Sequence, residues 1–213
     1  GEQTIDGKTY TFDEKGVGTL KQDKWNQLLE TYENDSSVNQ LIFVQYQGGS
    51  NAQVILYEKQ NGSWKEDFSC QGYVGGNGID KVKEGDRKTP TGVFGFTKAF
   101  GIKDNPGAKL PYTKLNPYLY WCGDEQWYNT LVDVRETPHE CSGEHLISYV
   151  PHYNYVLAID YNPECIFGKG SAIFLHCTGS NPYTGGCVAV SESNMIRIMQ
   201  TVDKGAKICI YPQ

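Results

Sequence analysis

A histidine and a cysteine near the C-terminal end have the residue types of a thiol nucleophile and its base. His176 ends an apolar run that begins at Ala172, and Cys187 directly follows two glycines. A free thiol has a pKa of about 8.5, so at neutral pH it needs a neighbouring base to become a good nucleophile. The loop between the two residues contains Gly, Asn and Pro and could fold His176 back onto Cys187. We predict that Cys187 is a nucleophile and His176 its general base.

The same two residues also have a simpler explanation. A histidine at a strand end is usually a packed or surface residue, and an isolated cysteine is usually buried and inert. The glycines favour catalysis, because Gly185 and Gly186 allow a tight backbone path and would leave the Cys187 N–H open toward a developing oxyanion. Spacing alone leaves both explanations open.

The chain has seven cysteines, so at least one thiol is free or pairs outside the chain; they are Cys70, Cys122, Cys141, Cys165, Cys177, Cys187 and Cys209. No spacing gives a CxxC pair, and His176-Cys177 is the one adjacent Cys/His combination. We therefore predict no metal site and no cofactor. If the chain is secreted, Cys122 and Cys141 are the pair we expect to be bridged, because they bracket a proline-rich segment.

The pattern along the chain predicts a mainly β fold with a few helices. Apolar spacing predicts one helix over Trp25–Tyr32 and a second around Met195–Val202, with Ser191 or Ser193 as its N-cap. Residues 101–150 are irregular and rich in proline, which is typical of a lid or substrate wall. The expected strands cover residues 41–46, 53–59, 63–70, 155–161, 172–176 and 206–211.

Three further histidines lie in or next to the irregular segment. His145 either lines the cleft or is a loop histidine bonded to nearby backbone. His139 and His152 each stand beside a proline, and we expect both on surface loops.

Composition excludes some partners. The formal charge of −6 and a pI near 5.2 argue against nucleic acid, because phosphate binding needs a basic face. No apolar stretch is long enough for a transmembrane segment, and the first residues do not form a signal peptide. A mature or trimmed secreted protein would look the same.

Several motifs together resemble the L,D-transpeptidase catalytic domain, also called the YkuD-type domain, in its Gram-positive branch. The family pattern is a strand ending in His, a loop, and [S/T]-x-G-C before an apolar residue, which is His176 and then Thr184-Gly185-Gly186-Cys187-Val188 here. The segment Gly85-Asp86-Arg87-Lys88-Thr89-Pro90-Thr91-Gly92-Val93-Phe94 is similar to the family's G-D-x-K-T-P-x-G-x-F, and Ser142-Gly143-Glu144-His145-Leu146 is also similar to a family segment. Two positions depart from many members: Gly185 stands where a second histidine is common, and Ala189 where Arg or Asn is common.

The resemblance implies a fold, a reaction and a set of roles. The fold would be a twisted β-sandwich with a lid, and Cys187 would attack a peptidoglycan tetrapeptide stem, release D-alanine and pass the acyl group to an amine, giving a 3→3 crosslink. The N–H groups of Gly186 and Cys187 would hold the oxyanion, Thr184 would bond to substrate or brace the turn, and the carbonyl of Cys177 would orient His176. Carbapenem-type inhibitors, secretion or wall association, and the absence of metals and cofactors are implied as well.

Two other functions stay open: an L,D-carboxypeptidase, in which water replaces the amine, and a wall-binding protein with an inactive catalytic domain. Residues 1–20 bear on the wall-binding function, because we expect them to form a hairpin with turns at Asp6-Gly7 and Lys15-Gly16. This segment is similar to one cell-wall-binding repeat of the choline-binding type, although an ordinary hairpin explains it equally well. We expect residues 21–213 to form the catalytic domain.

Overall fold

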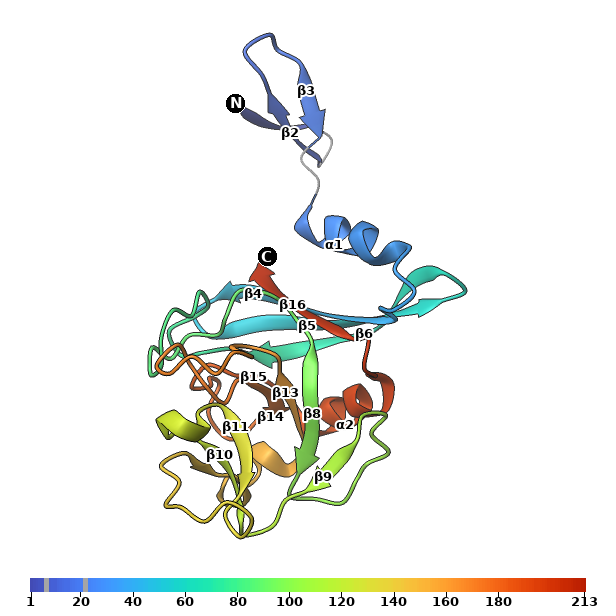
Figure 1. Cartoon of the computed structure of the whole chain (residues 1–213). Coiled ribbons are helices and arrows are strands. Elements are labelled where there is room, and N and C mark those ends of the chain that lie inside the picture. The colour runs from blue at the N-terminus through green and yellow to red at the C-terminus, as the bar shows by residue number, and fades with distance from the viewer. Residues whose placement is uncertain (6–7, 21–22) are drawn as a thin grey trace.

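Ten strands form one large sheet whose two halves face each other across the core (Figure 1). The structure is a computed structural model that describes residues 1–5, 8–20 and 23–213. The strand order is β7-β16-β4-β5-β6-β15-β14-β13-β8-β9. The bounds are β4 Gln40–Gly48, β5 Asn51–Gln60, β6 Ser63–Tyr73, β7 Gly92–Phe94, β8 Phe96–Gly101, β9 Tyr112–Lys114, β13 Val156–Ile159, β14 Phe174–Cys177, β15 Val188–Val190 and β16 Lys207–Pro212.

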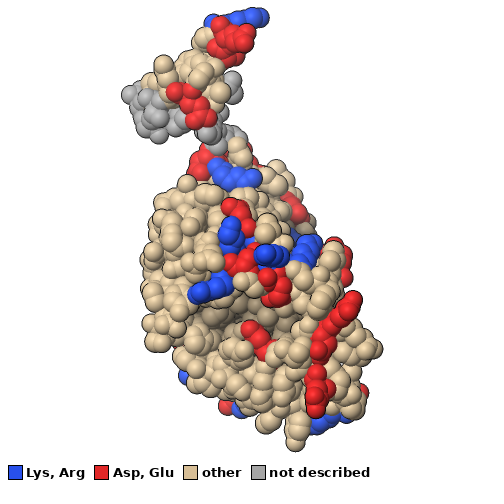
Figure 2. All heavy atoms as spheres, turned by 90° about the vertical axis from the view of Figure 1, so that its left-hand side faces the viewer, with Lys and Arg blue, Asp and Glu red and all other residues tan. Residues whose placement is uncertain are grey.

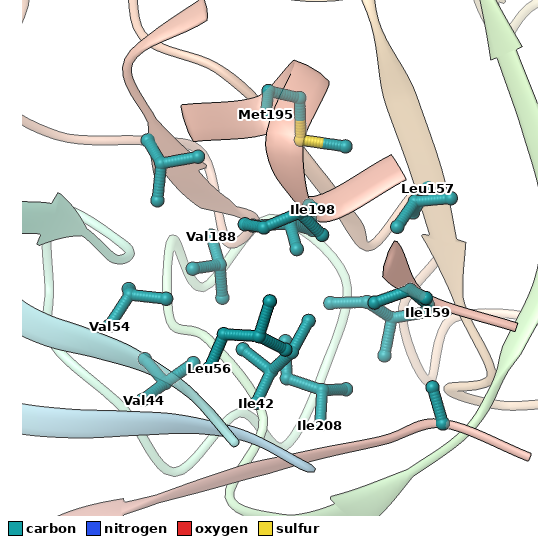
Figure 3. Packing of buried hydrophobic residues seen from close by; sticks show 14 of the residues in the cluster. Ile42, Val44, Val54, Leu56, Leu157, Ile159, Val188, Met195, Ile198 and Ile208 are labelled. Atoms are coloured by element: carbon teal, nitrogen blue, oxygen red, sulfur yellow. The ribbon is translucent and has the colours of Figure 1, made fainter. Parts of the chain in front are cut away.

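The central core lies between β4–β5 on one side and β13–β15 with the second helix on the other (Figure 3). Successive side chains of a strand point to opposite faces. In β4, Ile42 and Val44 therefore face this core, while Leu41 and Phe43 face the outer layer. Both faces of the strand are buried, which explains its continuous apolar run. The mainly β, sandwich-like fold expected from the sequence is confirmed.

Two α-helices close the layers, and both were predicted from apolar spacing. Helix α1, Lys24–Glu33, is capped by the Asp23 carboxylate, which accepts from Trp25 N, and its Trp25 and Leu28 pack on the outer face of the sheet. Helix α2, Glu192–Thr201, is capped by the Ser191 hydroxyl, the first of the two predicted caps. Among the described residues, neither helix is long and apolar enough to cross a membrane.

The segment expected to be irregular contains a second, three-stranded sheet. Its order is β11-β10-β12, with β10 Leu119–Cys122, β11 Thr130–Asp133 and β12 Glu144–His145. Its Trp121 packs with Phe100, Phe174 and Tyr153 in a hydrophobic cluster of its own. The segment therefore covers one face of β13–β14, as a lid would. Three short 3₁₀ helices adjoin it: η1 Glu125–Trp127, η2 Leu146–Ser148 and η3 His152–Asn154.

The N-terminal residues form a small antiparallel sheet of three strands, β1 Glu2–Ile5, β2 Lys8–Phe12 and β3 Gly18–Leu20. The third strand extends the single hairpin that the sequence predicts. At the Lys15-Gly16 turn the Asp13 carboxylate accepts from Lys15 N and Val17 N, and Gly16 has a φ of +77°. The predicted turn at Asp6-Gly7 lies outside the described residues. The hydrophobic clusters of the large domain begin only at Trp25.

Candidate active site

His176 and Cys187 are placed by two neighbouring parallel strands, β14 and β15, with His176 in register with Ala189. Alternation along β14 turns Leu175 and Cys177 into the central core and Phe174 and His176 to the face below the lid. His176 and Cys187 both line one cavity of about 860 Å³. Figure 2 shows basic and acidic side chains intermixed over a hollowed face of the molecule, and not a single basic stripe.

The His176 ring is held in one orientation by the backbone. Its Nδ1 lies 2.8 Å from the carbonyl oxygen of Cys177. Because a carbonyl can only accept, Nδ1 carries the proton and Nε2 is left as the basic nitrogen. Burial lowers the pKa of His176 to about 4. The ring is therefore neutral at pH 7 and can accept a proton.

The Cys187 thiol is buried and protonated in this arrangement. Its Sγ donates to the carbonyl oxygen of Ala172 at 3.2 Å and accepts from the N–H of Phe174 at 3.3 Å. Burial, and then the negative charge of Glu144, raise the pKa of the thiol to about 12. Since the thiol proton points to Ala172, the side chain must turn before it can give that proton to His176.

The turn before Cys187 is braced by two hydroxyls that bind the same carbonyl. Thr184 Oγ1 donates to the Cys187 carbonyl at 2.7 Å, and Thr89 Oγ1 donates to it at 3.0 Å. Thr184 Oγ1 also accepts from the N–H of Gly186 at 3.1 Å. Of the two roles expected for Thr184, these hydrogen bonds show that it braces the turn. Gly186 N–H, one of the two donors expected at the oxyanion, is thus used within the turn in this structure.

The two glycines are not equivalent, which corrects the expectation that both are needed for a tight path. Gly186 has a φ of +145°, and a Cβ there would lie 2.9 Å from the carbonyl oxygen of Lys88. A Cβ on Gly185 would meet nothing within 4 Å. Gly186 is required by the backbone, whereas Gly185 leaves open space beside the nucleophile.

The side chains of Cys177 and His145 do not line the cavity. Cys177 is fully buried in the central core, and it is its carbonyl that orients His176, as the resemblance implied. His145 Nε2 lies 2.8 Å from the carbonyl of Pro117, and its ring stacks on Tyr120 with centroids 4.5 Å apart. Of the two alternatives, His145 is thus the histidine bonded to backbone, although it lies in strand β12 and not in a loop, and its side chain is not part of the cavity lining.

Sequence reasoning missed Glu144, Tyr153 and His152, which all line the cavity. Tyr153 donates a hydrogen bond to the Glu144 carboxylate. Burial raises the pKa of Glu144 to about 7, although the bond from Tyr153 opposes this shift. His152 was expected on a surface loop, but its ring lies 5.9 Å from that of His176. The sequence signal for Glu144 was its place in Ser142-Gly143-Glu144-His145-Leu146, the segment that is similar to a family segment.

The motif at residues 85–94 packs against the turn that carries the nucleophile, and its own residues do not line the cavity. Asp86 makes a buried ion pair with Lys81 at 2.9 Å and accepts from the N–H groups of Val82 and Lys88. These bonds hold the pKa of Asp86 well below its usual range, despite its burial. The motif fixes the loop that carries Thr89 to the Cys187 carbonyl.

A sequence model described as the L,D-transpeptidase catalytic domain, YkuD, matches residues 27–210. Among solved structures, the helical cell shape determining protein Pgp2 from Campylobacter jejuni is 18% identical with a TM-score of 0.47, covering 88% of this chain and 55% of that one. Bd1075 from Bdellovibrio bacteriovorus is 14% identical with a TM-score of 0.45, covering 82% and 48%. An Enterococcus faecium L,D-transpeptidase is 15% identical with a TM-score of 0.37, covering 81% and 50%.

The chain thus spans about half the length of these solved structures. No curated protein matches its sequence. The family assignment does not depend on these distant structures, because the match at 27–210 includes the strands, the turn and the lid that build the cavity. The chain belongs to the L,D-transpeptidase catalytic-domain family.

Proposed function

We propose that this protein is a peptidoglycan L,D-transpeptidase that uses Cys187 as its nucleophile. The observation that carries the proposal is the neutral pair in one cavity: a buried thiol, and an imidazole whose Nδ1 is bonded to the Cys177 carbonyl. After the thiol turns from Ala172, Nε2 of His176 takes its proton, and the thiolate attacks the carbonyl of the third residue of a tetrapeptide stem. D-Alanine leaves, and an amine of a second stem takes the acyl group.

The backbone offers a donor for the oxyanion of this reaction. Gly186 N–H is bonded to Thr184, so we assign the oxyanion to the N–H of Cys187 itself. The Thr184 and Thr89 hydroxyls on the Cys187 carbonyl support this assignment, because they fix the peptide that carries the nucleophile. No metal or organic cofactor takes part in the proposed steps.

A second candidate, L,D-carboxypeptidase, is favoured by the open space at Gly185. Many family members carry a histidine at this position. Without that side chain, water has more room beside the acyl-enzyme. The donor stem and the acylation step are the same for both candidates, which differ only in the acceptor.

The nucleophile is tested by intact-mass measurement after exposure to a carbapenem, which acylates an activated thiolate. The wild-type chain should gain one adduct, and Cys187→Ala should gain none. Cys165→Ser is the matched control, because Cys165 lies in a loop and its thiol bonds to the carbonyl of Pro163; it should react as the wild type does. An adduct that persists in Cys187→Ala would remove Cys187 from this role.

The acceptor is tested by incubating purified wall tetrapeptides with the enzyme and separating the products by mass. Dimers with a 3→3 link support transpeptidation, whereas tripeptides alone would assign the chain as a carboxypeptidase. If tetrapeptides stay intact while pentapeptides lose D-alanine, the L,D assignment is wrong. We also propose that the protein acts outside the cytoplasm, where these stems are crosslinked.

A further inference from the structure

A group of side chains that could bind a metal ion lies in the lid, apart from the reactive pair. Cys122, Asp124, His139 and Cys141 each offer one ligand atom, and the four atoms all lie within 4.8 Å of one another. The first two residues stand at the end of β10 and just after it, and the other two lie in the loop that leads to β12. In the sequence they form Cys-x-Asp and His-x-Cys pairs. A search for CxxC spacing does not find this arrangement.

The separations among Cys122, Asp124 and His139 are close to the edges of a tetrahedral zinc site, and the Cys141 thiol lies within 4.8 Å of all three. Zn–N, Zn–O and Zn–S bonds of about 2.0–2.3 Å require ligand atoms about 3.3–3.8 Å apart. Cys122 Sγ lies 3.2 Å from Asp124 Oδ2 and 3.3 Å from His139 Nε2, and His139 Nε2 lies 3.6 Å from Asp124 Oδ2. The side chains are therefore close to a coordinating arrangement without a change of backbone.

The surrounding hydrogen bonds set the donor atoms for a cation. His139 Nδ1 lies 2.7 Å from the carbonyl of Thr137, which can only accept, so Nε2 carries its lone pair toward the other three groups. Asp124 Oδ1 accepts from the Ser142 hydroxyl at 2.6 Å, and Oδ2 accepts from the Ser142 N–H and from the Cys122 thiol, each at 3.2 Å. Bonds of this kind behind the ligands are the usual support of a protein zinc site.

We propose that Cys122, Asp124, His139 and Cys141 bind one zinc ion that holds the lid in place. Two thiolates, a neutral imidazole and a carboxylate form a closed four-coordinate set, which is typical of a structural site. On binding, the two thiols release their protons to solvent, and the zinc–ligand group carries a net charge of −1. The proposal departs from our sequence-based expectation that the chain holds no metal. The expected disulfide between Cys122 and Cys141 is wrong, because both residues are free thiols in the structure.

The zinc ion would join two parts of the cavity wall. Trp121 in β10 and Gly123 just after it flank Cys122 and line the cavity, while Ser142 and Gly143 follow Cys141 and line it from the loop. A Cβ on Gly143 would lie 1.9 Å from the carbonyl of Trp121, so the loop packs directly against the strand. A metal at this junction keeps the two in contact and so fixes the position of the neighbouring Glu144.

The proposal is tested by metal analysis of the full chain, purified with reductant, incubated with zinc and desalted. Wild type and the control Cys165→Ser should retain about one zinc per chain, and His139→Ala and Cys141→Ser should lose it. Equal zinc in wild type and His139→Ala, or none in wild type, would overturn the proposal.

Two measurements on the wild type keep the test independent of how the variants fold. Cobalt(II) should give the absorption bands of a tetrahedral thiolate site. Removal of zinc by a chelator should raise hydrogen exchange in residues 137–143 and not in β4. Octahedral cobalt bands without charge transfer from sulfur, or hydrogen exchange in residues 137–143 that a chelator leaves unchanged, would contradict the proposal. Neither result depends on the reaction at Cys187.

Discussion

At the scale of single residues, the reactive pair is stored in its neutral form. Burial lowers the pKa of His176 to about 4 and raises that of Cys187 to about 12. A thiolate–imidazolium ion pair between them is therefore unfavourable until bound substrate, or the oxyanion formed from it, stabilises the charges. We infer that substrate binding, and not a preformed thiolate, starts the reaction, because the thiol is still bonded to Ala172.

The Glu144 charge adds to the effect of burial on the pKa of Cys187, and Glu144→Gln should therefore make Cys187 more reactive toward iodoacetamide. The ionised carboxylate is the second cause, after burial, of the raised pKa of Cys187. Glutamine removes the charge and can still accept a hydrogen bond from Tyr153. The pH profile of alkylation should move to lower pH, and the thiolate population at a fixed pH should rise about tenfold if the thiol pKa falls by one. A profile identical to that of wild type would show that Glu144 does not act on the thiol.

The same residue should make folding stability depend on pH. The pKa of Glu144 is about 7 in the folded chain and about 4.5 in an ordinary carboxyl, so the folded state binds more protons between these values. Its contribution to stability is complete below about pH 4.5 and is lost as the pH rises through 7. The stability of Glu144→Gln relative to wild type should therefore increase from pH 5 to pH 8.

Urea unfolding of both proteins at several pH values measures this difference. His176 has the opposite dependence, because its pKa is lowered to about 4. Its contribution falls as the pH drops from 6.5 through 4, and it cancels in the comparison since both proteins contain it. A difference between the two proteins that is constant with pH would refute the role of Glu144.

At the scale of elements, the turn before β15 decides where the nucleophile sits. Gly186→Ala should destabilise the fold by about 1–3 kcal/mol, because a φ of +145° is strained for any residue with a Cβ. Gly185→Ala should change stability by less than about 1 kcal/mol, since its Cβ meets open space. Carbapenem acylation should fall in the first variant and persist in the second. Equal losses in the two variants would mean that the backbone at 186 is not the constraint.

The sequence predicts elements better than it predicts side-chain partners. Apolar spacing predicted both α-helices, and β-rich segments joined by the Asn61-Gly62 turn predicted the long strands β4–β6, because these signals are local in the sequence. The strands β10–β12 were missed because each is short and pairs across a proline-rich segment. The pairing of Thr184 with Thr89 on one carbonyl joins positions far apart in the chain. Nothing local signals such a contact, and the same holds for Cys122 and His139.

At the scale of the whole molecule, each layer has a different role. The central core joins the two halves of the sheet, α1 covers the outer face, and the lid covers the face that carries His176. The N-terminal sheet lies outside this order, and the family match begins after it, at residue 27. We propose that residues 1–20 serve wall binding and not catalysis, which follows the similarity of this segment to a wall-binding repeat.

A chain that begins at Asp23 should therefore fold and react as the full chain does. It keeps the N-cap of α1, and the hydrophobic clusters start at Trp25. Its thermal midpoint should stay within about 2 °C of the full chain, since a loss of 1 kcal/mol would shift it by about 2–4 °C in a domain of this size. Scanning calorimetry measures the midpoint, and intact mass measures carbapenem acylation.

A matched second truncation that begins at Asn34 tests whether this boundary is specific. It removes Trp25, whose ring lies 4.9 Å from that of Phe43, and Leu28, and so exposes the outer face of the sheet. Loss of two buried apolar side chains of this size costs several kcal/mol, about 2–5 for each, and this chain should unfold at a much lower temperature.

Sedimentation with purified walls tests the proposed wall binding by residues 1–20: the full chain should bind more than the chain beginning at Asp23. Equal binding by the two would assign wall recognition to the catalytic domain and leave residues 1–20 without this role.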